Sequence, residues 1–177
     1  MAATLRRTHR PARSAHEMPV KLTVRKRFEA QGFCGLDDTT LEKLAPWIRW
    51  TYTLGTLVTA IGVALMSPGV LWTLAAITAV GIVLPFHPFD LLYNYGVRHL
   101  TGTGPFPNSG PQRHFVFAVA TGWLLATGWA FHVGADALGI ALGVLLIFVG
   151  GLASTTNFCI PSFIYNTVTG RRSRQGV

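Results

Sequence analysis

Charge is distributed along this 177-residue chain in a way that only a few folds allow. No Lys, Arg, Asp or Glu occurs between Arg49 and Asp90, between Arg113 and Asp136, or between Asp136 and Arg171. A soluble domain carries about 25% charged residues, whereas this chain carries 12% and is 50% hydrophobic. A bilayer core about 30 Å thick needs roughly 20 apolar residues per helix. The first interval can therefore hold two membrane helices, and each of the others can hold one.

Two short turns divide the apolar intervals into hairpins. Ser67-Pro68-Gly69 interrupts the first interval, and residues 134–136 separate the second interval from the third. We therefore predict an all-α, polytopic integral membrane protein with four transmembrane helices arranged as two hairpins. The four helices are expected at Trp47–Met66, Gly69–Phe86, His114–Val133 and Ala137–Thr156.

The basic residues predict the orientation. Lys and Arg near the ends of membrane helices are retained on the cytoplasmic side. Most of the 15 Lys and Arg residues precede the first predicted helix, the others lie between the hairpins or after the last helix, and neither hairpin turn contains one. This pattern predicts that both termini and the central loop are cytoplasmic, in the inner (cytoplasmic) membrane.

The ends of the chain differ in composition from its middle. Residues 1–36 are basic and lack apolar periodicity, which predicts a largely disordered cytoplasmic arm, with translation starting at Met1 or Met18. Residues 37–168 form the predicted transmembrane domain, and residues 169–177 a basic tail. The net charge of +8 favours anionic lipid headgroups as partners over nucleic acid. The arginines flank membrane helices, and no set of aromatic residues for base stacking is interspersed with them.

Small residues recur inside the predicted helices, and close packing of membrane helices depends on such residues. They predict a compact four-helix bundle, although the same stripes could instead serve a homo-oligomer or a contact with other membrane subunits. The stripes are Ala118, Gly122, Ala126 and Ala130 in the third helix, Gly139, Gly143, Gly150 and Gly151 in the fourth, and Thr56, Ala60 and Ala64 in the first.

The histidines are weak candidates for cofactor binding. His87 and His114 flank the inner ends of the second and third helices, and His132 lies at the outer end of the third. Imidazoles at matched depth could bind a haem or pigment, but solvated or hydrogen-bonded histidines give the same pattern. No metal-binding spacing occurs in the sequence, and the cofactor, if there is one, stays unknown at this stage.

Polar residues gather on the predicted cytoplasmic face. Asp90 follows Pro88 and is expected to cap a short helix, with Arg98 farther along that helix. These side chains could line a polar pocket, or anchor lipid headgroups. The candidate site comprises Asp90, Tyr93, Asn94, Arg98, Asn157, Cys159, Tyr165 and Asn166.

Two segments resemble a bacterial membrane family. Residues 158–165 (Phe-Cys-Ile-Pro-Ser-Phe-Ile-Tyr) are similar to the Phe-Cys-x-x-Cys-x-x-Tyr ending of the family called domain of unknown function 4395, and residues 87–93 resemble its central loop. The resemblance covers roughly residues 47–168. It implies a redox setting with thioredoxin-like or sulfur-transfer partners. Ser162 replaces the second cysteine of that ending, so this chain cannot form the corresponding disulfide.

The sequence leaves the function open among three classes. The first is a non-catalytic scaffold, assembly factor or accessory subunit, because no predicted helix has a central charge and no catalytic spacing occurs. The second is a redox or sulfur-handling protein that uses Cys159 or a bound haem, pigment or quinone. The third is a small-molecule transporter or pore lined by threonines, although such threonines usually bond to carbonyls of their own helix. We favour the first class, in which the protein is not an enzyme, while the second class leaves enzymatic activity open.

Overall fold

The computed structural model describes residues 43–44, 46–106, 110–156 and 160–169. The basic arm predicted for residues 1–36 and all but the first residue of the predicted tail lie outside these ranges. The helices are α3 (Trp50–Ala64), α4 (Pro68–Val83), α5 (Pro88–Leu92), a π-helix (Tyr93–Val97), α6 (Arg98–Thr101), α7 (Pro111–His132), α8 (Asp136–Thr156) and α9 (Ile160–Val168).

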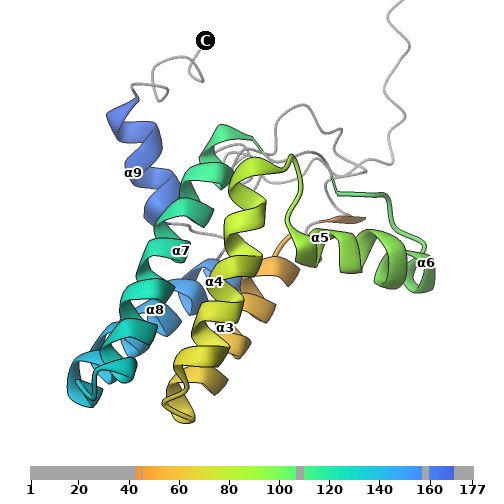
Figure 1. Cartoon of the computed structure of the whole chain (residues 1–177). Coiled ribbons are helices and arrows are strands. Elements are labelled where there is room, and N and C mark those ends of the chain that lie inside the picture. The colour runs from red at the N-terminus through yellow and green to blue at the C-terminus, as the bar shows by residue number, and fades with distance from the viewer. Residues whose placement is uncertain (1–42, 45, 107–109, 157–159, 170–177) are drawn as a thin grey trace, which may run out of the picture.

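The four long helices form the two predicted hairpins, α3 with α4 and α7 with α8 (Figure 1). Helix α4 packs along α7, and α3 packs along α8. We call these four helices the helical core. The short helices α5 and α6 extend away from one end of this core, and α9 packs on α7 at the same end (Figure 1).

Both predicted turns are confirmed, and their local chemistry explains them. Ser67 caps α4, since its Oγ accepts a hydrogen bond from the backbone N–H of Val70 at 3.4 Å, and Pro68 occupies the first helical position. In the second turn Gly134 has a φ of +76°, a left-handed conformation that glycine adopts without strain. Gly134 thus lies in the turn between the end of α7 at His132 and the start of α8 at Asp136, as the sequence indicated.

The predicted number of membrane crossings is confirmed only in part. Within the described residues, α7 and α8 are each long and apolar enough to span a membrane. Helix α4 passes the same test only together with the segment Pro88–Thr101, from which it is bent by 86°, and this pair counts as at most one further span. Helix α3 has 15 residues, about 22 Å at 1.5 Å per residue, which is shorter than the bilayer core. Two or three candidate spans therefore replace the expected four.

Of the predicted small-residue stripe of α7, only Ala130 is buried within the helical core, so the prediction of packing inside the bundle is wrong for the other three residues. The alternative, a contact with another subunit, stays a prediction. Ala118, Gly122 and Ala126 are exposed, and a Cβ added at Gly122 would meet no atom within 4 Å. The close approach on α7 occurs at Gly128, where a Cβ would lie 2.5 Å from the indole nitrogen of Trp72 in α4. An apolar helix can bury any of its faces, so its sequence did not specify the correct rotation.

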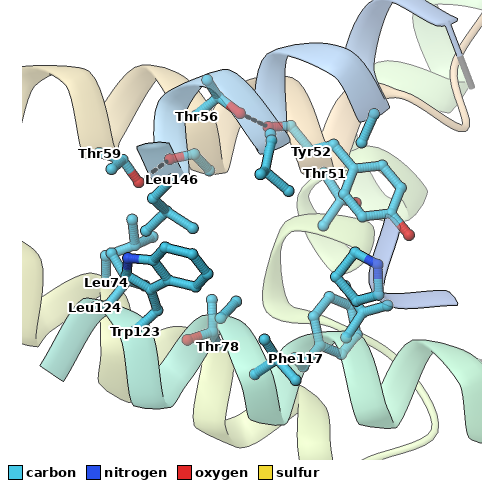
Figure 2. A pocket seen from close by; sticks show the side chains of 18 of the residues that line it. Thr51, Tyr52, Thr56, Thr59, Leu74, Thr78, Phe117, Trp123, Leu124 and Leu146 are labelled. Atoms are coloured by element: carbon cyan, nitrogen blue, oxygen red, sulfur yellow. Dashed lines mark hydrogen bonds between the residues drawn. The ribbon is translucent and has the colours of Figure 1, made fainter. Parts of the chain in front are cut away.

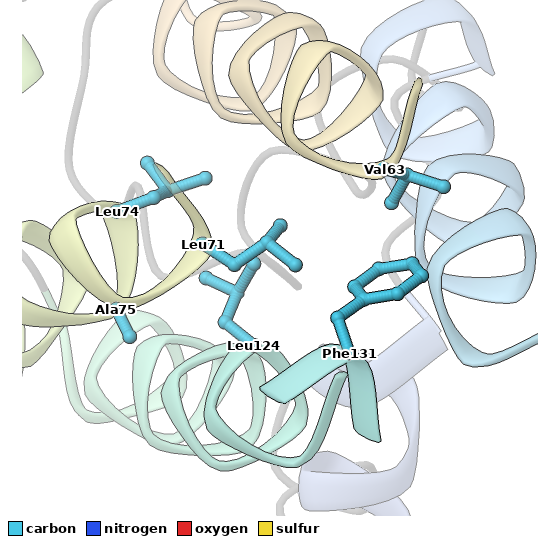
Figure 3. Close-up of a cluster of buried hydrophobic side chains, with 6 residues drawn as sticks. All are labelled: Val63, Leu71, Leu74, Ala75, Leu124 and Phe131. Carbon is cyan, nitrogen blue, oxygen red and sulfur yellow. The ribbon is translucent and has the colours of Figure 1, made fainter. Parts of the chain in front are cut away.

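The predicted glycines of α8 do make close contacts. A Cβ added at Gly143 would overlap Val63 of α3, one at Gly150 would overlap Thr56 of α3, and one at Gly139 would overlap the ring of Phe131. Beside these contacts lies a cluster of buried side chains from α3, α4 and α7 (Figure 3). Its members are Val63, Leu71, Leu74, Ala75, Leu124 and Phe131. This cluster holds the turn end of the helical core together.

Candidate functional site

A capping box starts α5 at the opposite end of the helical core. Nδ1 of His87 accepts a hydrogen bond from the backbone N–H of Phe89 at 3.2 Å. The carboxylate of Asp90 accepts one from the backbone N–H of His87 at 3.1 Å. Pro88 occupies the first helical position, where a missing N–H costs nothing. The predicted capping role of Asp90 is thus confirmed.

Asp90 also forms a buried ion pair. Nη2 of Arg113, in α7, lies 2.9 Å and 3.2 Å from the two carboxylate oxygens of Asp90, and the hydroxyl of Thr51, in α3, donates to the same carboxylate. All three side chains are buried. The ion pair and the Thr51 hydroxyl therefore connect α3, α5 and α7.

Tyr93 and Asn94 contact the chain around α5. The ring of Tyr93 stacks on Phe106 at 4.1 Å between centroids and lies 5.5 Å from Trp47. The side-chain oxygen of Asn94 accepts a hydrogen bond from the backbone N–H of Phe106 at 2.9 Å. Tyr93 is fully buried. These two candidate residues therefore fasten the residues before α3 and after α6 to the π-helix.

The remaining polar candidates lie apart from this cluster. Tyr165, in α9, lies 5.4 Å from the ring of Phe115 in α7, and Asn166 follows it in α9. Helix α9 and the α5–α6 segment lie on different sides of the helical core (Figure 1). Arg98 is half-buried at the start of α6. Asn157 and Cys159 lie outside the described residues, so the structure does not gather the predicted set into one pocket.

Two of the three candidate histidines, His114 and His132, contact residues of the helical core. Nδ1 of His114 lies 2.7 Å from the carbonyl oxygen of Ile82 and so connects α7 to α4. His132 is exposed at the end of α7, where its ring lies 5.3 Å from Trp72 and 5.7 Å from Trp129. Within the described ranges, no three His, Cys, Asp or Glu side chains come together as a metal site.

A cavity of about 120 Å³, partly open to the surroundings, lies between the long helices of the helical core, and its lining includes His87 and Pro161. Its wall is mainly aliphatic and aromatic, and three of its four threonines bond to carbonyls of their own helices, whereas Thr51 donates to Asp90. The hydroxyls of Thr56 and Thr59 donate to the carbonyls of Tyr52 and Gly55, each at 2.8 Å, and Thr78 donates to that of Ala75 at 2.9 Å. The lining side chains labelled in Figure 2 are Thr51, Tyr52, Thr56, Thr59, Leu74, Thr78, Phe117, Trp123, Leu124 and Leu146.

His87 is the imidazole in this wall. Its side chain is 1% exposed, its ring packs against Phe117 at 4.5 Å and Phe89 at 5.1 Å, and its Nε2 has no hydrogen-bond partner within the described part of the chain. His87 lies in the link between α4 and α5, outside both helices. Burial lowers the pKa of His87 to about 4, an effect that the charge of Asp90 opposes and that of Arg113 strengthens. The ring is therefore neutral at pH 7.

Comparison with known families agrees with the resemblance noted in the sequence. A family model described as a domain of unknown function matches residues 45–169 of the chain. The chain belongs to the DUF4395 family. No curated protein and no solved structure gives a significant match. In this DUF4395 chain Ser162, which stands at the second cysteine position of the resembling motif, is buried at 2% exposure.

Sequence reasoning on this DUF4395 chain missed Arg113 and the cavity. One signal could have found the ion pair: Asp90 and Arg113 each terminate a charge-free interval, so the hairpins bring both to the same end of the helical core. No comparable signal marks the cavity, which depends on how four apolar helices leave space between them. Trp123 of α7 contacts α8, since its indole N–H donates to the carbonyl of Leu142 at 3.1 Å.

Proposed function

We propose that this DUF4395 protein is a non-catalytic integral membrane protein that inserts the helical core as a four-helix bundle and holds a small apolar ligand inside it. The cavity carries this proposal. An engineered apolar cavity of about 150 Å³ binds benzene, so a cavity of about 120 Å³ matches one six-membered ring. Among the described residues that line it there is no carboxylate and no cysteine, which favours binding over catalysis.

The outer surface of the helical core supports insertion. Large apolar side chains are exposed on several long helices, among them Ile61 on α3, Trp129 on α7 and Phe148 on α8. Lipid tails satisfy such surfaces, and all backbone groups within a helix are already bonded. Because a bilayer thins locally around short helices at modest cost, α3 and α4 can cross it beside α7 and α8. Cytoplasmic termini and an inner-membrane location belong to this proposal.

Cavity filling tests ligand binding. Gly55 lines the cavity, and a Cβ added there meets no atom within 4 Å, so Gly55→Leu should place its side chain in the empty space. We expect benzene, at about 100 times its Kd, to raise the unfolding temperature of the wild-type protein in detergent by about 5–10 °C. In Gly55→Leu this rise should be lost.

Gly122→Leu is the matched control for this experiment. Gly122 lies in α7, is exposed, and likewise has open space around an added Cβ. The same substitution there should leave the effect of benzene intact. Equal stabilisation of Gly55→Leu and Gly122→Leu by benzene would contradict the cavity as the binding site.

Cysteine labelling tests insertion and orientation. In a background with Cys34→Ser and Cys159→Ser, a single cysteine is placed at Gly69 or Val133 at the hairpin turns, or at Leu100 in α6, all of which are exposed. We expect a membrane-impermeant maleimide to label Gly69→Cys and Val133→Cys from the periplasmic side and Leu100→Cys only from the cytoplasmic side. Labelling of both turns and of α6 from one side would refute the four-span arrangement.

The other functional classes stay predictions from the sequence. A protein that holds a ligand without transforming it can act as an accessory subunit, as the scaffold hypothesis expects. The redox alternative through Cys159 concerns a residue outside the described ranges. The threonine-lined pore is not proposed further, because Thr56, Thr59 and Thr78 use their hydroxyls within their own helices.

A further inference from the structure

The segment from α5 to α6 has two different faces. It is bent by 86° from α4, so it runs across the end of the helical core and not along it (Figure 1). Covered and exposed residues alternate in it with helical spacing. Residues 90, 93–94 and 97–98 are buried or half-buried, whereas residues 92, 95–96 and 99–100 are exposed. One face of the α5–α6 segment is therefore uncovered from its first turn to its last.

The covered face is turned away from the two hairpin turns. Tyr93 packs there against Trp47, which precedes α3, and against Phe106, which follows α6. The chain after α6 returns along the side of α5 and α6 that is remote from the hairpin turns (Figure 1). The uncovered face therefore points to the opposite side, where the body of the helical core lies.

The uncovered face is apolar, and the charge beside it is basic. Leu92 is 57% exposed, Tyr95 81% and Leu100 88%. Arg98 is half-buried next to them, and residues 91–106 contain no Asp or Glu. An apolar face flanked by basic residues is typical of helices that lie in the interface of an anionic membrane. A second copy of this surface would instead bring another basic segment close to the first, which charge repulsion disfavours.

Resting on the proposed insertion of the helical core, we infer that the α5–α6 segment lies flat in the headgroup layer and binds anionic phospholipid there. Leu92, Tyr95 and Leu100 reach the upper part of the acyl chains, and Arg98 attracts the phosphates. Helix α4 is then one complete crossing followed by a surface helix, and the bent pair is not a broken span. The headgroup layer is hydrated, so a cysteine at Leu100 still reacts with the maleimide from this side alone.

Fluorescence quenching by lipid-borne nitroxides tests this placement. In the Cys34→Ser, Cys159→Ser background, an NBD label is attached at Leu92→Cys or Leu100→Cys, and the protein is reconstituted in equal parts of phosphatidylcholine and phosphatidylglycerol. We expect a nitroxide near the headgroup end of the acyl chain to quench both labels more than one near the methyl end. Gly104→Cys is the matched control. Gly104 lies in the chain after α6 with open space around an added Cβ, and its label should stay unquenched.

The same label measures the selection of headgroups. The nitroxide is carried by phosphatidylglycerol or by phosphatidylcholine with the same acyl chains, so the two probes differ only in charge. At Leu100→Cys we expect stronger quenching by the phosphatidylglycerol probe. In Arg98→Gln the ratio of the two quenching constants should fall by about twofold to fivefold, because one basic residue near an anionic surface is lost.

The outcomes separate this inference from the proposed function. A label at Phe148→Cys, an exposed position of α8, reports insertion. If lipid nitroxides do not quench it, the helical core is not in the bilayer and both proposals fail. If they quench it but not the labels at Leu92 and Leu100, the insertion stands and the inference is overturned.

Three further results would also overturn the inference. Stronger quenching at Leu100 by the methyl-end nitroxide would mean that the segment enters the bilayer as part of a span. Equal quenching by the two headgroups would remove the anionic lipid as the partner. Quenching between NBD and nitroxide labels on two copies of Leu100→Cys, in place of quenching by lipid, would assign the face to a dimer.

Discussion

Asp90→Asn is expected to lower the free energy of unfolding by about 3–5 kcal/mol, because it removes one partner of a buried ion pair and leaves the charge of Arg113 without its carboxylate. Asparagine preserves the size of the side chain and an oxygen that can accept from Thr51 and from the His87 backbone. The loss should appear as a fall of roughly 6–20 °C in the unfolding temperature in detergent, followed by tryptophan fluorescence.

Asp136→Asn is the matched control for the ion pair. Asp136 begins α8 at the other end of the helical core and is exposed, so the same substitution removes only a favourable charge at a helix N-terminus, a loss of less than about 1 kcal/mol. The double variant Asp90→Asn, Arg113→Met should be more stable than Asp90→Asn alone, since it no longer buries a cation whose carboxylate has been removed. Equal stability of Asp90→Asn and Asp136→Asn would show that the ion pair does not hold the helices together.

Gly143→Leu is expected to separate α8 from α3. A Cβ at Gly143 would overlap the γ-carbons of Val63, and a β-branched side chain has little rotamer freedom with which to move away. Overpacking of this kind costs about 1–3 kcal/mol and more when helices must shift. The result should be a lower unfolding temperature and loss of benzene binding, since α3 and α8 form two walls of the cavity.

Two comparisons test whether the overlap with Val63 is the cause. Gly122→Leu adds the same side chain at an exposed position of α7 with open space, and its stability should equal or exceed that of the wild type. Gly143→Ala should be destabilising alone and partly rescued by Val63→Ala, which removes both γ-carbons. A Gly143→Leu protein as stable as Gly122→Leu would mean that the helices do not approach closely at this point.

Features that depend on neighbouring residues were predicted correctly from the sequence, whereas contacts between residues far apart in the sequence were not. Both turns were predicted correctly, because the capping of α4 by Ser67 and the left-handed φ of Gly134 depend mainly on neighbouring residues. The capping role of Asp90 followed for the same reason. The pairing of Asp90 with Arg113 was not predicted, since Arg113 lies 23 residues away in the sequence and reaches the carboxylate only after the hairpins have packed. Likewise, α7 uses Gly128 rather than Gly122.

The sequence by itself determined that the chain is helical, where its hairpins turn, and that it belongs to DUF4395, because charge-free intervals, turn residues and family motifs are written in the order of the residues. Only the tertiary structure decided which face of each apolar helix is buried, which charges pair, and where the cavity with His87 opens. The reason is physical: hydrophobicity does not distinguish between faces that are all apolar. Their arrangement is decided by shape, through the close approach at Gly143 and the space left beside Gly55.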